Sequence, residues 1–267
     1  MPAAHTDAWL DALIARHSGA MARPEFLKAV RALSARYVER RGSLPDRSPL
    51  DSAGKRAAFA GFYAPLHFLT MRAIVRALGA GEVDVNTIVD LGCGTGVSGI
   101  AWASEVARSP AIEGIDQNSW ALDDARQNWK DLGLHGRAQR RDMVIELERM
   151  AAAAPDARAA TRGVVIGWSL NELAPDSRAR AERAIQTIAA RRTPVILAEP
   201  IGRRLVPWWP EFTERAVRAG ARADEWRFED ALPPALASLD RDAGFQREGL
   251  TARSVAWVTR VTPPAAR

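Results

Sequence analysis

The chain contains very little cysteine. Only one of its 267 residues, Cys93, is a cysteine, so no disulfide can form within the chain. A zinc or iron–sulfur site held by cysteines is excluded for the same reason, and we predict no metal. A single thiol is compatible with a reducing compartment, and we expect a cytoplasmic protein.

The sequence also lacks long apolar runs. No stretch reaches the roughly 20 apolar residues that span a bilayer. The first twenty residues hold two aspartates, Asp7 and Asp11, and no continuous apolar segment, which is typical of neither a signal peptide nor a transit peptide. With 47% hydrophobic residues, we expect a soluble protein with one large domain or a domain with a modest extension, and no membrane contact.

Lysine is scarce, although the chain is basic. Only Lys28, Lys55 and Lys130 are lysines, and the pI is about 10.1. Residues 1–82 hold 12 lysines and arginines and 7 acids, so the whole net charge of +5 lies in this part. The excess indicates either a functional basic surface or the compositional bias of an arginine-rich genome.

Residues 1–82 show the spacing of helices. We expect one helix over residues 6–17 with Thr6 as its N-cap, and a second that begins at Pro24. Further helix follows to residue 78. The expected breaks are turn-forming: Gly42, the loop 43–52, Pro65 and Gly79. The prediction is a helical N-terminal extension.

Residues 83–262 alternate between strand and helix patterns, which predicts a parallel α/β sheet with right-handed crossovers. The expected strands are Thr87–Leu91, Ala111–Asp116, Arg137–Met143, Gly163–Trp168, Pro194–Glu199, Trp226–Phe228 and Ser254–Val261. The expected helices are Val97–Ala107, Ala121–Leu132, Val144–Ala154 and Ser177–Arg191. Residues 263–267 form a tail.

A glycine-rich loop follows the first strand, reading Asp90-Leu91-Gly92-Cys93-Gly94-Thr95-Gly96. Such a loop lets the backbone approach a ligand at the start of a helix. Asp116 ends the second strand, where a carboxylate can accept both hydroxyls of a ribose, and Asp142 ends the third, where it could accept an adenine amino group.

A dinucleotide site is the competing interpretation, because residues 94–99 also fit G-x-G-x-x-G. That reading needs the strand to continue through Cys93, which would bury Asp90 unpaired in the sheet at high cost. We therefore expect the strand to end earlier and Asp90 to face the ligand.

The Asp-x-Gly-x-Gly-x-Gly pattern resembles motif I of the class I S-adenosylmethionine (SAM)-dependent methyltransferases. The resemblance implies a Rossmann-like sheet of seven strands with the last antiparallel, and SAM as the cofactor. It implies that Asp90 and the loop hold the amino-acid part of SAM, Asp116 the ribose and Asp142 the adenine. Gln117 departs from the usual apolar residue that packs on the adenine. The cofactor-binding prediction comprises Asp90, Gly92, Cys93, Gly94, Gly96, Asp116, Gln117, Asp142, Met143 and Trp168.

In this class the segment after the fourth strand approaches the transferred methyl group. Here it reads Gly167-Trp168-Ser169-Leu170-Asn171-Glu172-Leu173, not the Asn/Asp-Pro-Pro-Tyr/Phe tetrapeptide of many nitrogen methyltransferases. Asn171 and Glu172 are candidate catalytic groups. The alternative is a helix start, with Asn171 as N-cap and Glu172 in its first turn. No cysteine suits the covalent chemistry of 5-methylpyrimidine formation.

Several segments also resemble the methyltransferase-like proteins of mitochondrial and bacterial small-ribosomal-subunit assembly. They are Leu33–Tyr37 with Arg41-Gly42, the helix Tyr63–Leu78, the glycine loop, Trp168–Leu173 and Ala198–Gly202. The cysteine cluster of that family has no counterpart here, since residues 223–228 contain no cysteine.

Three functions stay open. The first is a methyltransferase acting on RNA, including ribosomal RNA, whose partner would be RNA or a ribosomal subunit. The second is a methyltransferase acting on a small molecule or a protein. The third is a non-catalytic assembly factor that keeps the cofactor fold. A basic cleft beside the loop favours the first, a closed apolar pocket the second, and a shallow site without polar groups the third. Extensions such as residues 1–82 usually recognise the acceptor.

Overall fold

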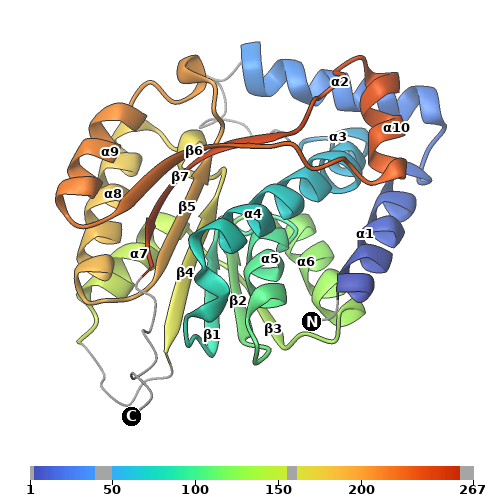
Figure 1. Cartoon of the computed structure of the whole chain (residues 1–267). Helices are drawn as coiled ribbons and strands as arrows, with labels where there is room; N and C mark the ends of the chain where they lie inside the picture. The colour runs from blue at the N-terminus through green and yellow to red at the C-terminus, as the bar shows by residue number, and fades with distance from the viewer. Residues whose placement is uncertain (1–2, 40–49, 155–160, 259–267) are drawn as a thin grey trace.

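The computed structural model describes residues 3–39, 50–154 and 161–258. It is an α/β structure in which helices cover both faces of a central sheet (Figure 1). The strands are β1 Thr87–Leu91, β2 Ala111–Asp116, β3 Gly136–Arg140, β4 Arg162–Gly167, β5 Val195–Glu199, β6 Arg222–Phe228 and β7 Leu250–Trp257. The helices are α1 Ala3–Ser18, α2 Arg23–Glu39, α3 Ala53–Ala58, α4 Ala64–Leu78, α5 Val97–Glu105, α6 Ser119–Asp131, α7 Met143–Ala152, α8 Pro175–Ala190, α9 Trp209–Arg218 and α10 Pro234–Ala243.

The sheet has seven strands in the order β3-β2-β1-β4-β5-β7-β6. The first five are parallel, and β7 runs antiparallel between β5 and β6. The predicted seven-stranded sheet with an antiparallel last strand is therefore confirmed. From β1 the chain winds outward to β2 and β3, then returns to place β4 on the other side of β1. Ligands of open α/β sheets bind at such a reversal, beyond the carboxyl ends of the strands.

Side-chain alternation along the strands divides the interior into two cores. Ile88 and Val165 point to the face covered by α4, α5 and α6, whereas Val89 and Val164 point to the face covered by α7, α8 and α9. Strands buried on both faces read as continuous apolar runs rather than alternating ones. This is why β1, β4 and β5 were recognisable in the sequence.

The N-terminal helices join the first of these cores. α1 contributes Trp9, Leu10 and Leu13, and α2 contributes Phe26 and Val30, all buried in one cluster with residues of α4, α5 and the sheet. Figure 1 shows α1 beside α6, and α2 along the upper edge of the molecule next to α10. The predicted helical extension is therefore packed onto the sheet domain.

Two details of the N-terminal prediction are wrong. Thr6 is not an N-cap: it lies inside α1, is buried, and accepts a hydrogen bond from Arg72 at 3.1 Å. Pro65 does not break the helix. A π-helical turn, Phe59–Tyr63, joins α3 to α4, and Pro65 lies in the first turn of α4, where its missing N–H is tolerated. Gly79 does end α4, with φ +67°.

Some predicted bounds also differ. The third strand ends at Arg140 rather than Met143, because Asp142 caps the following helix. The last two strands begin earlier than expected, and α9 and α10 were not predicted. Both helices carry proline in their first turn, a start signal that was present in the sequence. Gly42 and residues 43–49 of the expected loop lie outside the described residues.

One helical stretch in the described part of the chain, Ala53–Leu78, is long and apolar enough to cross a membrane by length and composition. Of its most apolar window, 67% is buried inside the protein. A core helix passes the same test, and these residues pack against α5 and the sheet.

Candidate functional site

The glycine loop turns the chain sharply from β1 into α5. β1 ends at Leu91, and Gly92, Gly94 and Gly96 all have positive φ, at +67°, +51° and +79°. L-residues rarely adopt these angles. A Cβ at Gly92 would lie 2.4 Å from the Ser169 Oγ. At Gly94, by contrast, a Cβ would meet only the Phe59 ring at 3.5 Å. Gly94 therefore presents bare backbone to the space above the loop.

Asp116 lies where the sequence placed it, at the end of β2. Its Oδ2 accepts a hydrogen bond from the Gly94 N–H and its Oδ1 one from the Asn118 N–H, both at 2.8 Å. Burial raises the pKa of this carboxyl. A carboxylate offers about four acceptor positions, so Asp116 keeps acceptor capacity for a ribose hydroxyl beyond these backbone donors. The residues present therefore fit a nucleoside at this point.

Asp90 does not face the ligand space, and that prediction is wrong. It lies inside β1, is fully buried, and its Oδ2 accepts a hydrogen bond from the Gly99 N–H of α5 at 2.7 Å. Its Oδ1 has no hydrogen-bond partner among the described residues. Burial raises its pKa to about 7. The physical reason is the pleat: the side chain of Asp90 alternates onto the α5 face of the sheet.

The expected strand end nevertheless holds. β1 ends at Leu91, before Cys93, although the buried Asp90 that we associated with the dinucleotide interpretation is present. Cys93 lies in the wall of the cavity described below as a small buried residue, and burial raises the pKa of its thiol well above the ordinary range. Such a thiol is a poor nucleophile at neutral pH.

Asp142 also lies elsewhere than predicted. It is the N-cap of α7, not the end of β3: its Oδ1 accepts hydrogen bonds from the Val144 and Ile145 N–H groups at 2.8 and 3.1 Å. Gln117 donates from Nε2 to Asp142 Oδ2 at 2.6 Å. The polar residue at 117 therefore has a partner, and the pair forms one rim of the cavity, with Met143 beside it.

The segment after β4 begins with an unusual backbone. Trp168 has φ +56°, a left-handed angle that is an outlier for a bulky residue and a hint of function. Its ring stacks on His67 of α4, with centroids 4.0 Å apart and planes 5° apart. Burial lowers the pKa of His67 to about 3, so the imidazole is neutral at physiological pH. The stack on Trp168 makes His67 a packing residue of the cavity wall.

Asn171 is not a helix N-cap, contrary to the alternative considered above. It lies in a single 3₁₀ turn, Leu170–Glu172, and α8 begins only at Pro175. The Asn171 Nδ2 donates to the Trp168 carbonyl at 2.9 Å and to Glu199 Oε2 at 2.5 Å. Its backbone N–H donates to Glu199 Oε1 at 3.1 Å. The buried Glu199 at the end of β5 thus fixes this turn.

These elements surround a cavity of about 940 Å³ at the carboxyl ends of the strands. All five segments that carry the assembly-family resemblance contribute to its wall: Ser34, Tyr63 and His67, the glycine loop, Trp168 with Asn171 and Glu172, and Pro200–Gly202. Sequence reasoning missed several other lining residues, namely Arg56, Phe59, Arg247 and Thr251. They stand far apart in the sequence and carry no motif, so no local signal announced them.

The cavity wall includes both apolar and polar side chains. Among the described residues, no group of three or more His, Cys, Asp or Glu side chains could hold a metal ion. The region that bears a cysteine cluster in the resembling family is β6 in this chain. This strand forms one edge of the sheet and pairs with β7.

Residues 72–153 match the family model of the methyltransferase small domain. The search of curated protein sequences found no relative. Among solved structures, the chain is similar to the plantazolicin methyltransferase BpumL in complex with SAH, with 10% identity over 86% of this chain and 95% of that one and a TM-score of 0.45.

Two further solved structures are similar. One is a SAM-dependent methyltransferase from Agrobacterium tumefaciens, with 13% identity, coverage of 73% and 62%, and a TM-score of 0.48. The other is a putative RNA methyltransferase, PH1948, from Pyrococcus horikoshii, with 12% identity, coverage of 72% and 83%, and a TM-score of 0.42. Such similarities carry no information about this chain's acceptor.

The matched range contains the glycine loop, Asp116 and Asp142, and lies at the reversal point of the seven-stranded sheet. Those residues leave room for the nucleoside of SAM, and the bare backbone at Gly94 allows close approach of the amino-acid part of SAM. The strand order, the loop geometry and the family match over residues 72–153 agree with the fold expected of a class I SAM-dependent methyltransferase.

Proposed function

We propose that this methyltransferase acts on a compact acceptor group, from a small molecule or a protein side chain, that enters the cavity beside the cofactor. The observation that carries the proposal is the shared wall: the N-terminal helices and the segment after β4 line the same cavity as the glycine loop. At about 940 Å³ the cavity reaches the upper end of the range for small-molecule sites, about 300–1,000 Å³. This size supports an acceptor group next to the cofactor.

The wall beyond the cofactor residues combines aromatic and polar groups. Phe59 packs edge-to-face on His67 with centroids 6.2 Å apart, and His67 stacks on Trp168. Tyr63 and Asn171 add a hydroxyl and an amide. Such polar groups argue against the non-catalytic alternative, for which a site without them was expected.

Bound SAM would supply an electrophilic methyl group: the acceptor's lone pair would bond to the methyl carbon as the carbon–sulfur bond breaks in line and S-adenosylhomocysteine leaves. The protein's part is to position the acceptor and to exclude water. Neutral His67 can hydrogen-bond an acceptor without repelling the cationic sulfonium. Asn171, held by Glu199, provides a fixed polar group near the turn. A base is needed only for an acceptor that must first lose a proton.

The described basic residues of the N-terminal part are mostly paired with acids. Ion pairs join Arg16 to Asp131, Arg23 to Asp242 and Arg76 to Glu105, at 2.9, 2.5 and 2.9 Å. An arginine already bound to a carboxylate is less available to phosphate. This pairing favours the compact acceptor over a nucleic acid.

RNA, including ribosomal RNA, is the second candidate. The cavity-lining residues Ser34 and Leu50 lie on either side of a chain segment that contains four arginines. The side chains of these arginines lie outside the described residues: Arg36, Arg40, Arg41 and Arg47. If RNA is the acceptor, Arg40→Glu with Arg41→Glu should weaken RNA binding at every sequence and flatten its salt dependence, without changing cofactor affinity. Filter binding at several salt concentrations would measure both effects, and negligible RNA affinity at low salt would exclude this candidate.

Labelled SAM incubated with fractionated cell extract tests the acceptor. Label in small molecules or protein, insensitive to ribonuclease, is the expected result. Label in RNA would replace the proposal with the second candidate, and a chain that binds cofactor but labels no fraction would favour an assembly factor. Gly94→Leu serves as the inactive control, because its side chain would fill the space above the loop.

Calorimetry tests the cofactor separately. S-adenosylhomocysteine should bind, and NAD should not. Tight NAD binding without a response to S-adenosylhomocysteine would overturn the cofactor assignment. A cytoplasmic location stays a prediction that follows from the single cysteine.

A further inference from the structure

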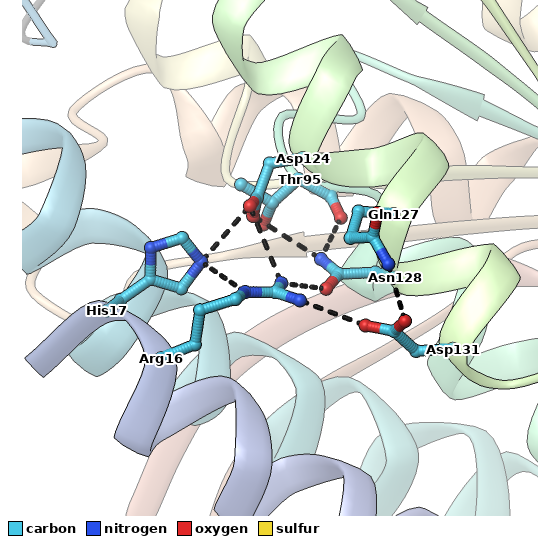
Figure 2. Close-up of polar contacts among 7 residues, drawn as sticks. All are labelled: Arg16, His17, Thr95, Asp124, Gln127, Asn128 and Asp131. Atoms are coloured by element: carbon cyan, nitrogen blue, oxygen red, sulfur yellow. Dashed lines mark hydrogen bonds and ion pairs between the residues drawn. The ribbon is translucent and has the colours of Figure 1, made fainter. Parts of the chain in front are cut away.

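The end of α1 is attached to α6 by a compact polar cluster (Figure 2). The guanidinium of Arg16 donates to Asp131 Oδ2 at 2.9 Å, to Asn128 Oδ1 at 2.7 Å and to Asp124 Oδ1 at 3.5 Å. The neighbouring His17 places its Nε2 3.1 Å from the same Asp124 oxygen. Residues separated by more than one hundred positions in the sequence thus meet on one helix face.

The same cluster reaches the glycine loop. The fully buried Asn128 donates from Nδ2 to the Thr95 carbonyl at 3.0 Å (Figure 2). The next residue, Trp129, lies directly under Gly96, where a Cβ would come within 2.8 Å of its ring nitrogen. Thr95 itself is fully buried between the two glycines. The underside of the loop is therefore held by two consecutive residues of α6.

The arginine also orients the amide that holds the loop. An asparagine amide has one accepting and one donating end, and its orientation follows from its partners. Arg16 occupies the Oδ1 end, which directs the NH₂ end toward the Thr95 carbonyl. A charged donor on the oxygen also polarises the amide and strengthens the hydrogen bond that its NH₂ group donates.

We propose that Arg16 and Asn128 are positioning residues for the cofactor: α1 holds the glycine loop in its binding conformation through α6. Three glycines give the loop large conformational freedom, and ordering it during binding would weaken the affinity for the cofactor. A loop already fixed from below avoids that cost. The inference rests on the proposed cofactor site and extends it to α1, a helix none of whose residues lines the cavity.

The test is Arg16→Ala against the matched control Arg23→Ala. Arg23 is also an N-terminal arginine, half-exposed and paired with an acid, but it joins α2 to Asp242 and Ser238 of α10. We expect Arg16→Ala to weaken S-adenosylhomocysteine binding by roughly threefold to tenfold, the range of couplings through shared contacts. Arg23→Ala should leave this affinity unchanged, although both variants should lower the melting temperature by similar small amounts.

Hydrogen exchange in the cofactor-free protein provides a second readout. The Gly94 and Gly96 N–H groups are bonded to Asp116 and to the Cys93 carbonyl, and their exchange should be faster in Arg16→Ala than in Arg23→Ala. This measurement remains informative even if the wild-type chain fails to bind S-adenosylhomocysteine. That failure would overturn the cofactor assignment. The role of Arg16 and Asn128 in holding the glycine loop would then be tested by hydrogen exchange alone.

Two more variants separate positioning from simple stabilisation. Asn128→Asp keeps oxygens for Arg16 and removes the donor to Thr95, so it should weaken binding at least as much as Arg16→Ala. Arg16→Lys keeps the charge but loses the planar guanidinium that donates to several partners at once, so its affinity should lie between those of Arg16→Ala and the wild type. Equal affinities and equal exchange in Arg16→Ala and Arg23→Ala, with only the melting temperature changed, would overturn the proposal.

Discussion

The carboxyl group of Asp90 is buried with only one of its oxygens hydrogen-bonded among the described residues. Its neighbours explain the arrangement: the Gly99 N–H at the start of α5 supplies one donor, and apolar strands surround the rest. Burial is the largest cause of its raised pKa, which lies near 7. Ionised Asp90 therefore destabilises the folded state, although its carboxylate also accepts a hydrogen bond from the first turn of α5.

Asp90 should make stability depend on pH. Because its pKa is raised on folding, the folded state binds the proton more tightly, and the stabilisation is present below pH 4 and lost as pH rises toward about 7. A tenfold difference in proton affinity between the folded and unfolded states corresponds to about 1.4 kcal/mol. We expect Asp90→Asn to gain at least about 1 kcal/mol relative to wild type between pH 5 and pH 8. Urea unfolding across this range would measure it, and parallel curves for the two proteins would contradict it.

Asp116 and Gly94 are joined by a hydrogen bond, and we expect both to contact the cofactor. Asp116→Ala should remove charge-assisted bonds to the ribose and lower the affinity for S-adenosylhomocysteine by roughly 10- to 100-fold. Gly94→Leu should abolish binding by filling the open space above the loop and straining a positive φ. Calorimetry on folded variants would test both. Wild-type affinity in both would mean that the site is misplaced.

At the scale of elements, α7 depends on Asp142 for its start. The carboxylate caps the helix through two backbone N–H groups and also accepts from Gln117. Asp142→Ala should cost about 1 kcal/mol of stability, whereas Asp142→Asn should cost only a few tenths, because asparagine caps equally well. Denaturant unfolding would separate the two variants. Equal losses would show that charge, and not capping, is the role of this residue in folding.

The segment after β4 shows how one element can serve two purposes. The left-handed Trp168 turns the chain out of the sheet and brings its ring onto His67. Asn171 then ties the turn to Glu199 at the end of the next strand. The Ser169 hydroxyl lies 3.0 Å from the Gly92 carbonyl and 2.9 Å from the Gly167 carbonyl, within donating distance of each. This turn and the glycine loop therefore support each other.

For the whole molecule, the shared core predicts a single cooperative unfolding transition. Leu13 of α1 is buried in the same cluster as the sheet residue Ile88. Leu13→Ala should cost about 2–5 kcal/mol of stability and lower one common transition. Val217, which is 49% exposed on α9, is the matched control: Val217→Ala should change stability by less than about 0.5 kcal/mol. Calorimetry would resolve two transitions if the N-terminal helices folded independently.

The sequence by itself determined the elements whose signals are local. The bounds of β1 follow from a short β-branched run, and those of β2 from its two isoleucines before Asp116. The glycine loop with Asp116 follows from spacing, because positive φ and strand ends are properties of a few neighbouring residues. The order of strands and helices likewise implied the parallel sheet, since a crossover helix forces its strands to run the same way.

Only the tertiary structure decided which way the acids point and what closes the site. Asp90 and Asp142 carry no local mark that separates a ligand contact from a helix contact, because the pleat and the following helix set their direction. The part of the cavity wall that lies away from the glycine loop is formed by α3, α4 and the chain before β7. These segments are distant in sequence, and only their shared burial brings them together. The link from Arg16 through Asn128 to Thr95 is of this kind: it exists only because shared hydrophobic burial brings α1 against α6.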